Sequence, residues 1–192
     1  MSTVEQTTYT PEDLLRMPDG DRYELVEGDL LEKRDMGALA IWVAGEVFAL
    51  LRDYAKHHGG WAFTDGVGYQ CYSFDSTRVR RPDASYVRPG RFDHDVLPEG
   101  HIRIPPDLAV EVVSPNDLYY KVEHKVDEYF QAGVSLVWVV NPAFKTVRVF
   151  RKSIQNLTQF GPGDEITDEE IMPGFRCRVI ELFPPQTEKS DS

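Results

Sequence analysis

The sequence is poor in cysteine, in long apolar runs and in positive charge. Its 192 residues include two cysteines, Cys71 and Cys177, and two isolated cysteines form no metal-ligand pattern and are more often buried thiols than a bridge. No apolar run approaches the roughly 18 residues that a membrane span needs. Residues 1–10 lack a positively charged start followed by an apolar segment, so we expect no secretory signal and a cytoplasmic protein.

The shortage of positive charge limits the partners that the protein can bind. With 21 Lys and Arg against 32 Asp and Glu, the net charge is −11, whereas proteins that bind DNA broadly are usually basic, because phosphate neutralisation supplies most of their non-specific affinity. Any nucleic-acid contact must therefore be local. Positive charge is concentrated in one stretch, which could be a phosphate-facing rim or a solvated loop. It contains Arg78, Arg80, Arg81, Arg88 and Arg91.

Length and composition indicate one globular domain. The hydrophobic share of 41% and the charged share of 28% are those of a soluble globular protein, and 192 residues leave little room for a second independent core. We expect a flexible N-terminus over residues 1–9, a single domain over residues 10–184 and a disordered tail over residues 185–192.

The first third of the chain predicts a short helix, a hairpin and a long helix. Thr10, followed by Pro11 and two acids, is typical of a helix start, and that helix should end near Met17. Two short strands, residues 23–26 and 29–32, flank a turn at Glu27 and Gly28. Residues 37–56 then place a stripe of apolar side chains at helical spacing: Leu39, Trp42, Val43, Val47, Leu50, Leu51 and Tyr54.

The middle of the chain predicts a parallel crossover. A buried strand within residues 106–115 is followed by a helix over residues 118–132, a C-cap at Gly133 and a strand over residues 136–140. Residues 145–151 alternate as a hairpin partner would, and residues 88–106 form a long loop. We predict an α/β fold with a mixed central sheet flanked by the two longer helices and an added N-terminal hairpin.

The buried strand contains one residue that does not suit it. Glu111 stands among apolar residues, Leu108-Ala109-Val110 before it and Val112-Val113 after it. A lone ionised carboxylate there would pay a large desolvation cost, so it must be protonated, paired or bound to a cation. Side chains alternate along a strand, so Glu111 shares a face with Ala109 and Val113. Glu111 is thus the first candidate for chemistry.

Two further residues could join Glu111. Asp83 opens the strand over residues 83–87, directly after Pro82, and if the two strands are neighbours the carboxylates can share Mg²⁺ or Mn²⁺. Lys125 falls on the edge of the apolar stripe that Leu118, Val122, Val126, Tyr129 and Phe130 form at about 100° per residue. From there its amine could approach the carboxylates and stabilise charge on a pentacoordinate phosphate.

Each residue also has a plainer explanation. Asp83 could be an acid in a strand-opening turn, Glu111 could pair with an arginine, and lysines at the edge of an apolar stripe are common in amphipathic helices. The three together favour chemistry more than any one of them alone.

The same residues carry a family resemblance. The segments Arg81-Pro82-Asp83, Glu111-Val112-Val113-Ser114-Pro115, Lys125 before Glu128-Tyr129, and Val137-Trp138-Val139-Val140-Asn141-Pro142 resemble the Uma-two type of restriction endonuclease in the PD-(D/E)XK nuclease superfamily. The likeness runs from about Tyr9 to Phe183, with Tyr23-Glu24-Leu25-Val26-Glu27-Gly28 and Pro173-Gly174-Phe175 included.

The resemblance implies a restriction-endonuclease-like fold and specific roles. Asp83 and Glu111 would be metal ligands, with the carbonyl of Val112 as a further one. The superfamily lysine usually stands two residues after the glutamate, where this chain has Val113, so Lys125 would supply the amine instead. Glu24 or Glu27 would correspond to an early family acid, although a turn role suits Glu27 better.

Three hypotheses about function remain open on the sequence. The first is a Mg²⁺- or Mn²⁺-dependent endonuclease acting on DNA, easiest to picture as a homodimer if it cuts both strands. The second is a nuclease-like binding or assembly module without turnover, favoured by the acidic charge and by Met36-Gly37-Ala38, where relatives often carry a histidine. A two-carboxylate glycosidase is the third, but no second acid stands at a suitable separation.

Overall fold

The computed structural model describes residues 8–33, 36–114, 117–153 and 156–185. Within this part of the chain, the central sheet has six strands. Their spatial order is β3 (Trp61–Thr64), β4 (Ala84–Val87), β5 (Leu108–Val112), β6 (Leu136–Asn141), β7 (Thr146–Arg151) and β8 (Asn156–Phe160). Strands β5 and β6 are parallel, and the other neighbours are antiparallel. The predicted mixed α/β sheet is therefore confirmed.

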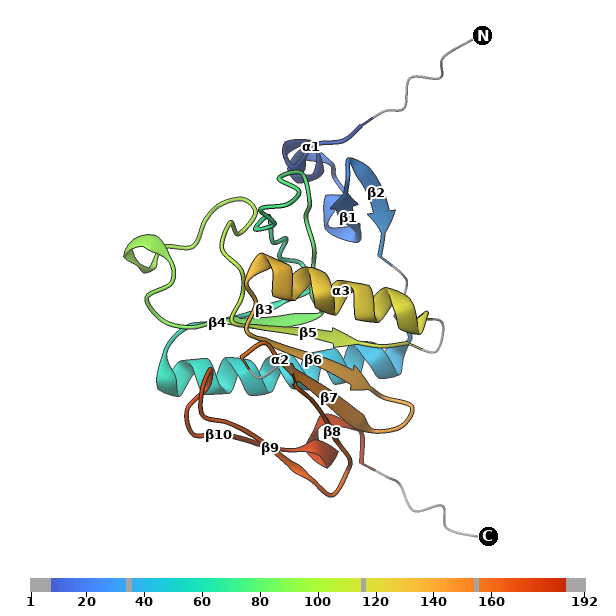
Figure 1. The fold of residues 1–192 in the computed structure, drawn as a ribbon, viewed down its shortest axis with the longest axis vertical. Helices are drawn as coiled ribbons and strands as arrows, with labels where there is room; N and C mark the ends of the chain where they lie inside the picture. The colour runs from blue at the N-terminus through green and yellow to red at the C-terminus, as the bar shows by residue number, and fades with distance from the viewer. Residues whose placement is uncertain (1–7, 34–35, 115–116, 154–155, 186–192) are drawn as a thin grey trace.

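Two helices cover opposite faces of this sheet (Figure 1). Helix α2 (Ala38–His58) packs on one face, and α3 (Tyr119–Ala132) packs on the other. The connection from β5 through α3 to the parallel strand β6 is the predicted crossover. Helix α3 ends at Gly133, whose φ of 106° lies in the left-handed region, as a glycine C-cap requires.

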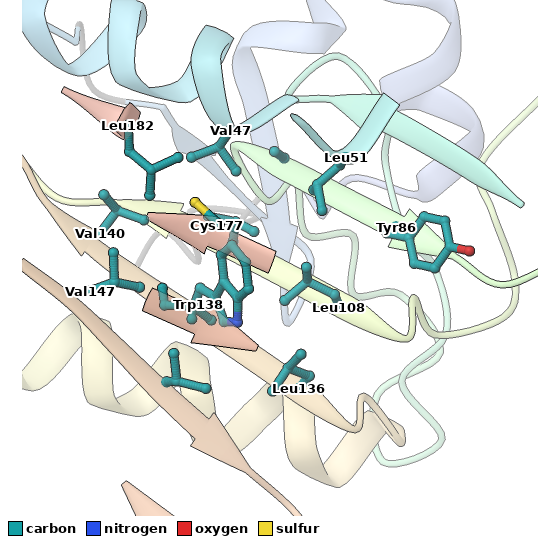
Figure 2. Packing of buried hydrophobic residues seen from close by; sticks show 14 of the residues in the cluster. Val47, Leu51, Tyr86, Leu108, Leu136, Trp138, Val140, Val147, Cys177 and Leu182 are labelled. Atoms are coloured by element: carbon teal, nitrogen blue, oxygen red, sulfur yellow. The ribbon is translucent and has the colours of Figure 1, made fainter. Parts of the chain in front are cut away.

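The larger core lies between the sheet and α2. Figure 2 shows Val47 and Leu51 of α2 facing side chains of the central strands, among them Leu108 and Trp138. Even-numbered residues of β5 and β6 point into this core, whereas Ala109, Val137 and Val139 point toward α3. This alternation follows from the two-residue period of a strand.

The N-terminal region is a short helix followed by a hairpin. In α1 (Pro11–Arg16), Thr10 forms a capping box with Asp13, and a 3₁₀ turn, η1 (Gly20–Arg22), leads to β1 (Tyr23–Val26) and β2 (Asp29–Glu32). Glu27 and Gly28, with φ of 53° and 85°, make the turn between the strands. These elements match the sequence prediction.

The remaining elements of the described residues are two 3₁₀ turns and a second hairpin. A 3₁₀ turn, η2 (Asp93–Asp95), interrupts the predicted loop. The hairpin of β9 (Glu165–Asp168) and β10 (Phe175–Arg178) and the 3₁₀ turn η3 (Val179–Leu182) add apolar side chains to the core on the α2 side of the sheet.

Some expectations about burial are wrong. Leu39 and Trp42 are exposed, because the buried side of α2 is a narrow stripe through Ala40, Val43, Val47, Leu51 and Tyr54. Leu118 is also exposed, since it is the N-cap of α3 and does not follow the helical stripe. Cys71 and Cys177 are both free thiols, as predicted, but Cys177 is buried whereas Cys71 is half-buried.

Other predictions remain untested. The predicted flexible N-terminus and tail fall largely on residues 1–7 and 186–192, and Pro115 of the resemblance motif also lies outside the described residues. Among the described residues, no helix combines the length and the apolar character needed to cross a membrane.

Candidate active site

The structure brings Glu111 and Lys125 into direct contact. Glu111 lies on β5 on the face that α3 covers, as its odd position in the strand predicts. The Lys125 amine, on α3, donates a hydrogen bond of 3.0 Å to Glu111 Oε2. Glu111 therefore pairs with this lysine, and the alternative of an arginine partner does not apply among the described residues.

Asp83 lies beside Glu111 at the start of β4. The register pairs Ala84 with Val110, and Asp83 Oδ2 accepts a 2.7 Å hydrogen bond from the Val112 N–H. Burial, followed by the negative charge of Glu111, raises the pKa of Asp83 to about 7. Two carboxylates thus repel each other in a poorly hydrated place, which is an arrangement that a cation would stabilise.

Glu24 is a third carboxylate at this place. Its Oε1 accepts hydrogen bonds from the Lys125 amine at 3.1 Å and from the Arg81 N–H at 3.0 Å. Burial by itself would raise the pKa of Glu24, but the charges of Lys125 and Arg80 lower it to about 2. Of the two early acids, Glu24 and Glu27, Glu24 is therefore the one at the site. Glu27 lies in the hairpin turn and is exposed.

Lys125 lies between two carboxylates and stays charged. Burial would lower the pKa of its amine, but Glu111 and Glu24 raise it well above its ordinary value. The amine therefore stays protonated at neutral pH and provides a fixed positive charge rather than a general acid. Such a charge suits stabilisation of a developing negative charge.

Sequence reasoning missed Tyr129 as a member of this cluster. The sequence pattern places Tyr129 in the apolar stripe of α3, and its ring is indeed buried. Its hydroxyl donates a 2.5 Å hydrogen bond to Glu111 Oε1. The spacing of four residues from Lys125 places both on one helical face, so this spacing was the signal that could have found Tyr129.

The arginines before Asp83 have neither of the two roles considered for them. Arg78, Arg80 and Arg81 are buried. Arg80 donates to Glu128 Oε2 at 2.7 Å and to Glu24 Oε2 at 2.8 Å. These side chains bind carboxylates and backbone carbonyls inside the protein, because a buried guanidinium needs a partner for its donors. They are therefore not a phosphate-facing rim or a solvated loop.

A cleft of about 540 Å³ opens over these residues. Its floor includes Asp83, Glu111 and Lys125, and its walls are formed by the end of β5, the β1–β2 hairpin and the first two turns of α3. This volume is within the range of about 300–1,000 Å³ for sites that hold a drug-sized molecule. The cleft is therefore large enough for a group of nucleotide size.

The oxygen atoms at the floor suit a hard divalent cation. Among the described residues, no group of three or more His, Cys, Asp and Glu side chains is arranged to hold a metal, so a cation would rely on two carboxylates, backbone oxygen and water. The N–H of Val112 points to Asp83, and the carbonyl of the same residue in a strand points to the same side. Asp83, Glu111 and the Val112 carbonyl together fit Mg²⁺, which usually keeps several waters.

The fold defines the class of protein. It matches a crystal structure from Anabaena variabilis described as "a putative nuclease belonging to DUF820", with a TM-score of 0.73, 20% sequence identity, and coverage of 91% of this chain and 97% of that chain. The class is a restriction-endonuclease-like α/β fold. Residues 11–180 match the family model Uma2, described as "Putative restriction endonuclease". The chain belongs to the Uma2 family. None of the curated proteins matches the sequence.

Proposed function

We propose that this protein is a Mg²⁺- or Mn²⁺-dependent endonuclease that hydrolyses phosphodiester bonds in DNA. The observation that carries the proposal is the convergence of Asp83, Glu111 and Lys125 at the floor of one cleft. Membership of a family whose model is described as "Putative restriction endonuclease" supports the same reaction.

In this proposal Asp83, Glu111 and the Val112 carbonyl hold the cation. A bound Mg²⁺ would supply a Lewis acid and an acidified water for attack on phosphorus. Lys125 lies 3.0 Å from Glu111 Oε2 and would stabilise the negative charge that grows on the phosphate oxygens. Tyr129, through its hydrogen bond to Oε1, would fix the orientation of the Glu111 carboxylate.

The second candidate is a binding or assembly module without turnover. The net charge of −11 favours it, because this charge opposes the approach of DNA. A cation that binds only the folded state adds about 2.7 kcal/mol to the free energy of unfolding at a concentration of one hundred times Kd. The melting temperature therefore rises. A rise with Mg²⁺ that Glu111→Ala abolishes would favour the nuclease over a module that has lost its metal.

The decisive experiment is cleavage of supercoiled plasmid with Mg²⁺ or Mn²⁺. Parent protein should nick the plasmid, and both Glu111→Ala and Lys125→Ala should lose the activity. Lys56→Ala is the matched control, since Lys56 is exposed at the last turn of α2. Failure of folded parent protein to cut either the plasmid or single-stranded DNA would reject the nuclease proposal.

The products also test the expected homodimer. A dimer that cuts both strands gives linear plasmid early in the reaction, whereas independent monomers give nicked circles first. Sedimentation of the protein under the same conditions would show whether two copies associate.

A further inference from the structure

Two neighbouring tyrosines at the start of α3 have the same exposure and different surroundings. The side chains of Tyr119 and Tyr120 belong to residues that are 66% and 64% exposed. The Tyr119 ring lies 5.0 Å from the guanidinium carbon of Arg148, which belongs to β7. Tyr120 instead lines the cleft above the carboxylates. The Tyr119 ring thus contacts a side chain of the sheet, whereas the Tyr120 ring is accessible to a ligand in the cleft.

Lys121 follows Tyr120 and lines the same cleft. Lys121 and Lys125 are one helical turn apart, which puts both on one side of α3, and both line the cleft. Lys125 is held by Glu24 and Glu111, and Lys33 is held by Asp65 at 2.8 Å. Lys121 is exposed and forms no ion pair within the part of the chain that the structure describes. It is therefore the lysine of this wall that remains available to an anion.

We propose that Tyr120 and Lys121 form a subsite for an unpaired nucleotide of single-stranded DNA, with the base on the Tyr120 ring and a phosphate at Lys121. This inference rests on the proposed function and specifies the substrate of the same cleft. The strand would then run along the first two turns of α3 and bring the next phosphodiester toward Lys125, Asp83 and Glu111.

Charge and base stacking favour a single strand over a duplex. A duplex is held mainly by many phosphate contacts, and this chain carries a net charge of −11 with one unpaired lysine on the described cleft wall. Stacking of a base on an aromatic ring needs no net charge and tolerates any sequence. The bases of a duplex already stack on each other, so they cannot cover Tyr120 unless the strands separate.

Binding is measured by fluorescence anisotropy with a labelled 12-nucleotide single strand and with the matching blunt duplex. The buffer contains EDTA, so that no cleavage occurs. Parent protein should prefer the single strand. Tyr120→Ala should weaken that binding about tenfold, Tyr120→Trp should restore it, and Lys121→Ala should weaken it while Lys121→Arg preserves it.

Tyr119→Ala is the matched control, because it removes the same group with the same exposure one residue away. Its affinity for the single strand should stay within twofold of the parent. Both tyrosines are exposed, so circular dichroism should show folded protein in each variant.

The outcomes separate this inference from the proposed function. Equal single-strand affinities of Tyr120→Ala and Tyr119→Ala, or a parent that prefers the duplex or binds neither DNA, would overturn the subsite. Plasmid cleavage that depends on Glu111 would keep the nuclease in those cases. Conversely, selective loss of binding in Tyr120→Ala, with no cleavage of plasmid or of single-stranded DNA by the parent, would support the subsite and reject the catalytic proposal.

Discussion

At the residue scale, Asp83 carries a charge that its surroundings disfavour. Burial and the nearby Glu111 raise its pKa to about 7, so the native state keeps a proton that the unfolded state has released between about pH 4 and pH 7. The stability of metal-free protein should therefore fall at this site as the pH rises through that window. Such a cost is common where a site is built for binding rather than stability.

The substitution Asp83→Asn tests this cost. Asparagine keeps an oxygen that can accept the hydrogen bond from the Val112 N–H and removes the repulsion with Glu111. We expect metal-free Asp83→Asn to be more stable than the parent at pH 8 by about 2–4 kcal/mol, with a smaller difference at pH 5, as measured by urea unfolding. An equal difference at both pH values would contradict the assignment of the shift to Asp83.

Tyr129 gives a second test at the residue scale. Tyr129→Phe keeps the buried ring and removes the hydroxyl that donates to Glu111 Oε1. Partners that orient a metal ligand typically contribute about 10–100-fold to metal affinity. We therefore expect the Mg²⁺ concentration for half-maximal cleavage to rise by about tenfold or more.

The control for this prediction is Tyr69→Phe. It removes another buried hydroxyl, which bonds to Ser85 Oγ at 2.7 Å. This variant should leave the Mg²⁺ requirement unchanged, even if its melting temperature falls. The same Mg²⁺ shift in both variants would mean that Tyr129 acts through general stability alone.

At the element scale, a buried ionic network attaches α3 to the N-terminal hairpin. Glu128 of α3 accepts hydrogen bonds from Arg80, and Arg80 also binds Glu24 of β1. Lys125 of α3 makes the second connection to Glu24. Figure 1 shows the β1–β2 hairpin above α3. The network therefore holds together the elements that carry the site residues.

Removal of Arg80 should be costly because two buried carboxylates, Glu24 and Glu128, would each lose one of their charged partners. Loss of one member of a buried ion network typically costs about 3–5 kcal/mol. We expect Arg80→Met to lose a similar amount in denaturant unfolding, whereas Arg176→Met, at an exposed pair with Glu165, should change stability by less than about 1 kcal/mol. Equal costs would show that burial of the network contributes nothing.

At the scale of the whole molecule, the acidic surface should make DNA binding only weakly dependent on salt. A plot of the logarithm of the binding constant against the logarithm of the salt concentration has a slope of about −0.7 per phosphate contact for a single strand. A protein with 6–10 phosphate contacts loses about 10³–10⁵-fold in DNA affinity between 50 and 200 mM salt. With one or two contacts near Lys121 and Lys125, we expect a loss of less than about tenfold over the same range. Anisotropy titrations at several salt concentrations measure this slope directly.

A steep salt slope would contradict this expectation. It would mean that cations outside the cleft bind the substrate, in spite of the net charge of −11. The Tyr120→Ala variant provides a further comparison, since loss of stacking should lower the affinity without changing the salt slope. Lys121→Ala should instead make the slope shallower by the contribution of about one phosphate contact.

The sequence by itself determined the elements and most of the candidate residues. Local signals are encoded in short segments, such as the cap at Thr10, the turn at Glu27 and Gly28, and the period of α3. A glutamate in an apolar strand is equally visible, because its desolvation must be offset wherever the strand lies. For these features, the physical cause acts within a few residues.

Only the tertiary structure decided which partners meet. Glu24 and Lys125 are 101 positions apart, and Arg80 and Glu128 are 48 positions apart, so no local pattern pairs them. The sequence likewise left Tyr119 and Tyr120 alike, and the packing of α3 over the sheet turned one toward Arg148 and the other into the cleft. Contacts between distant segments depend on how elements pack, and packing is a property of the whole chain.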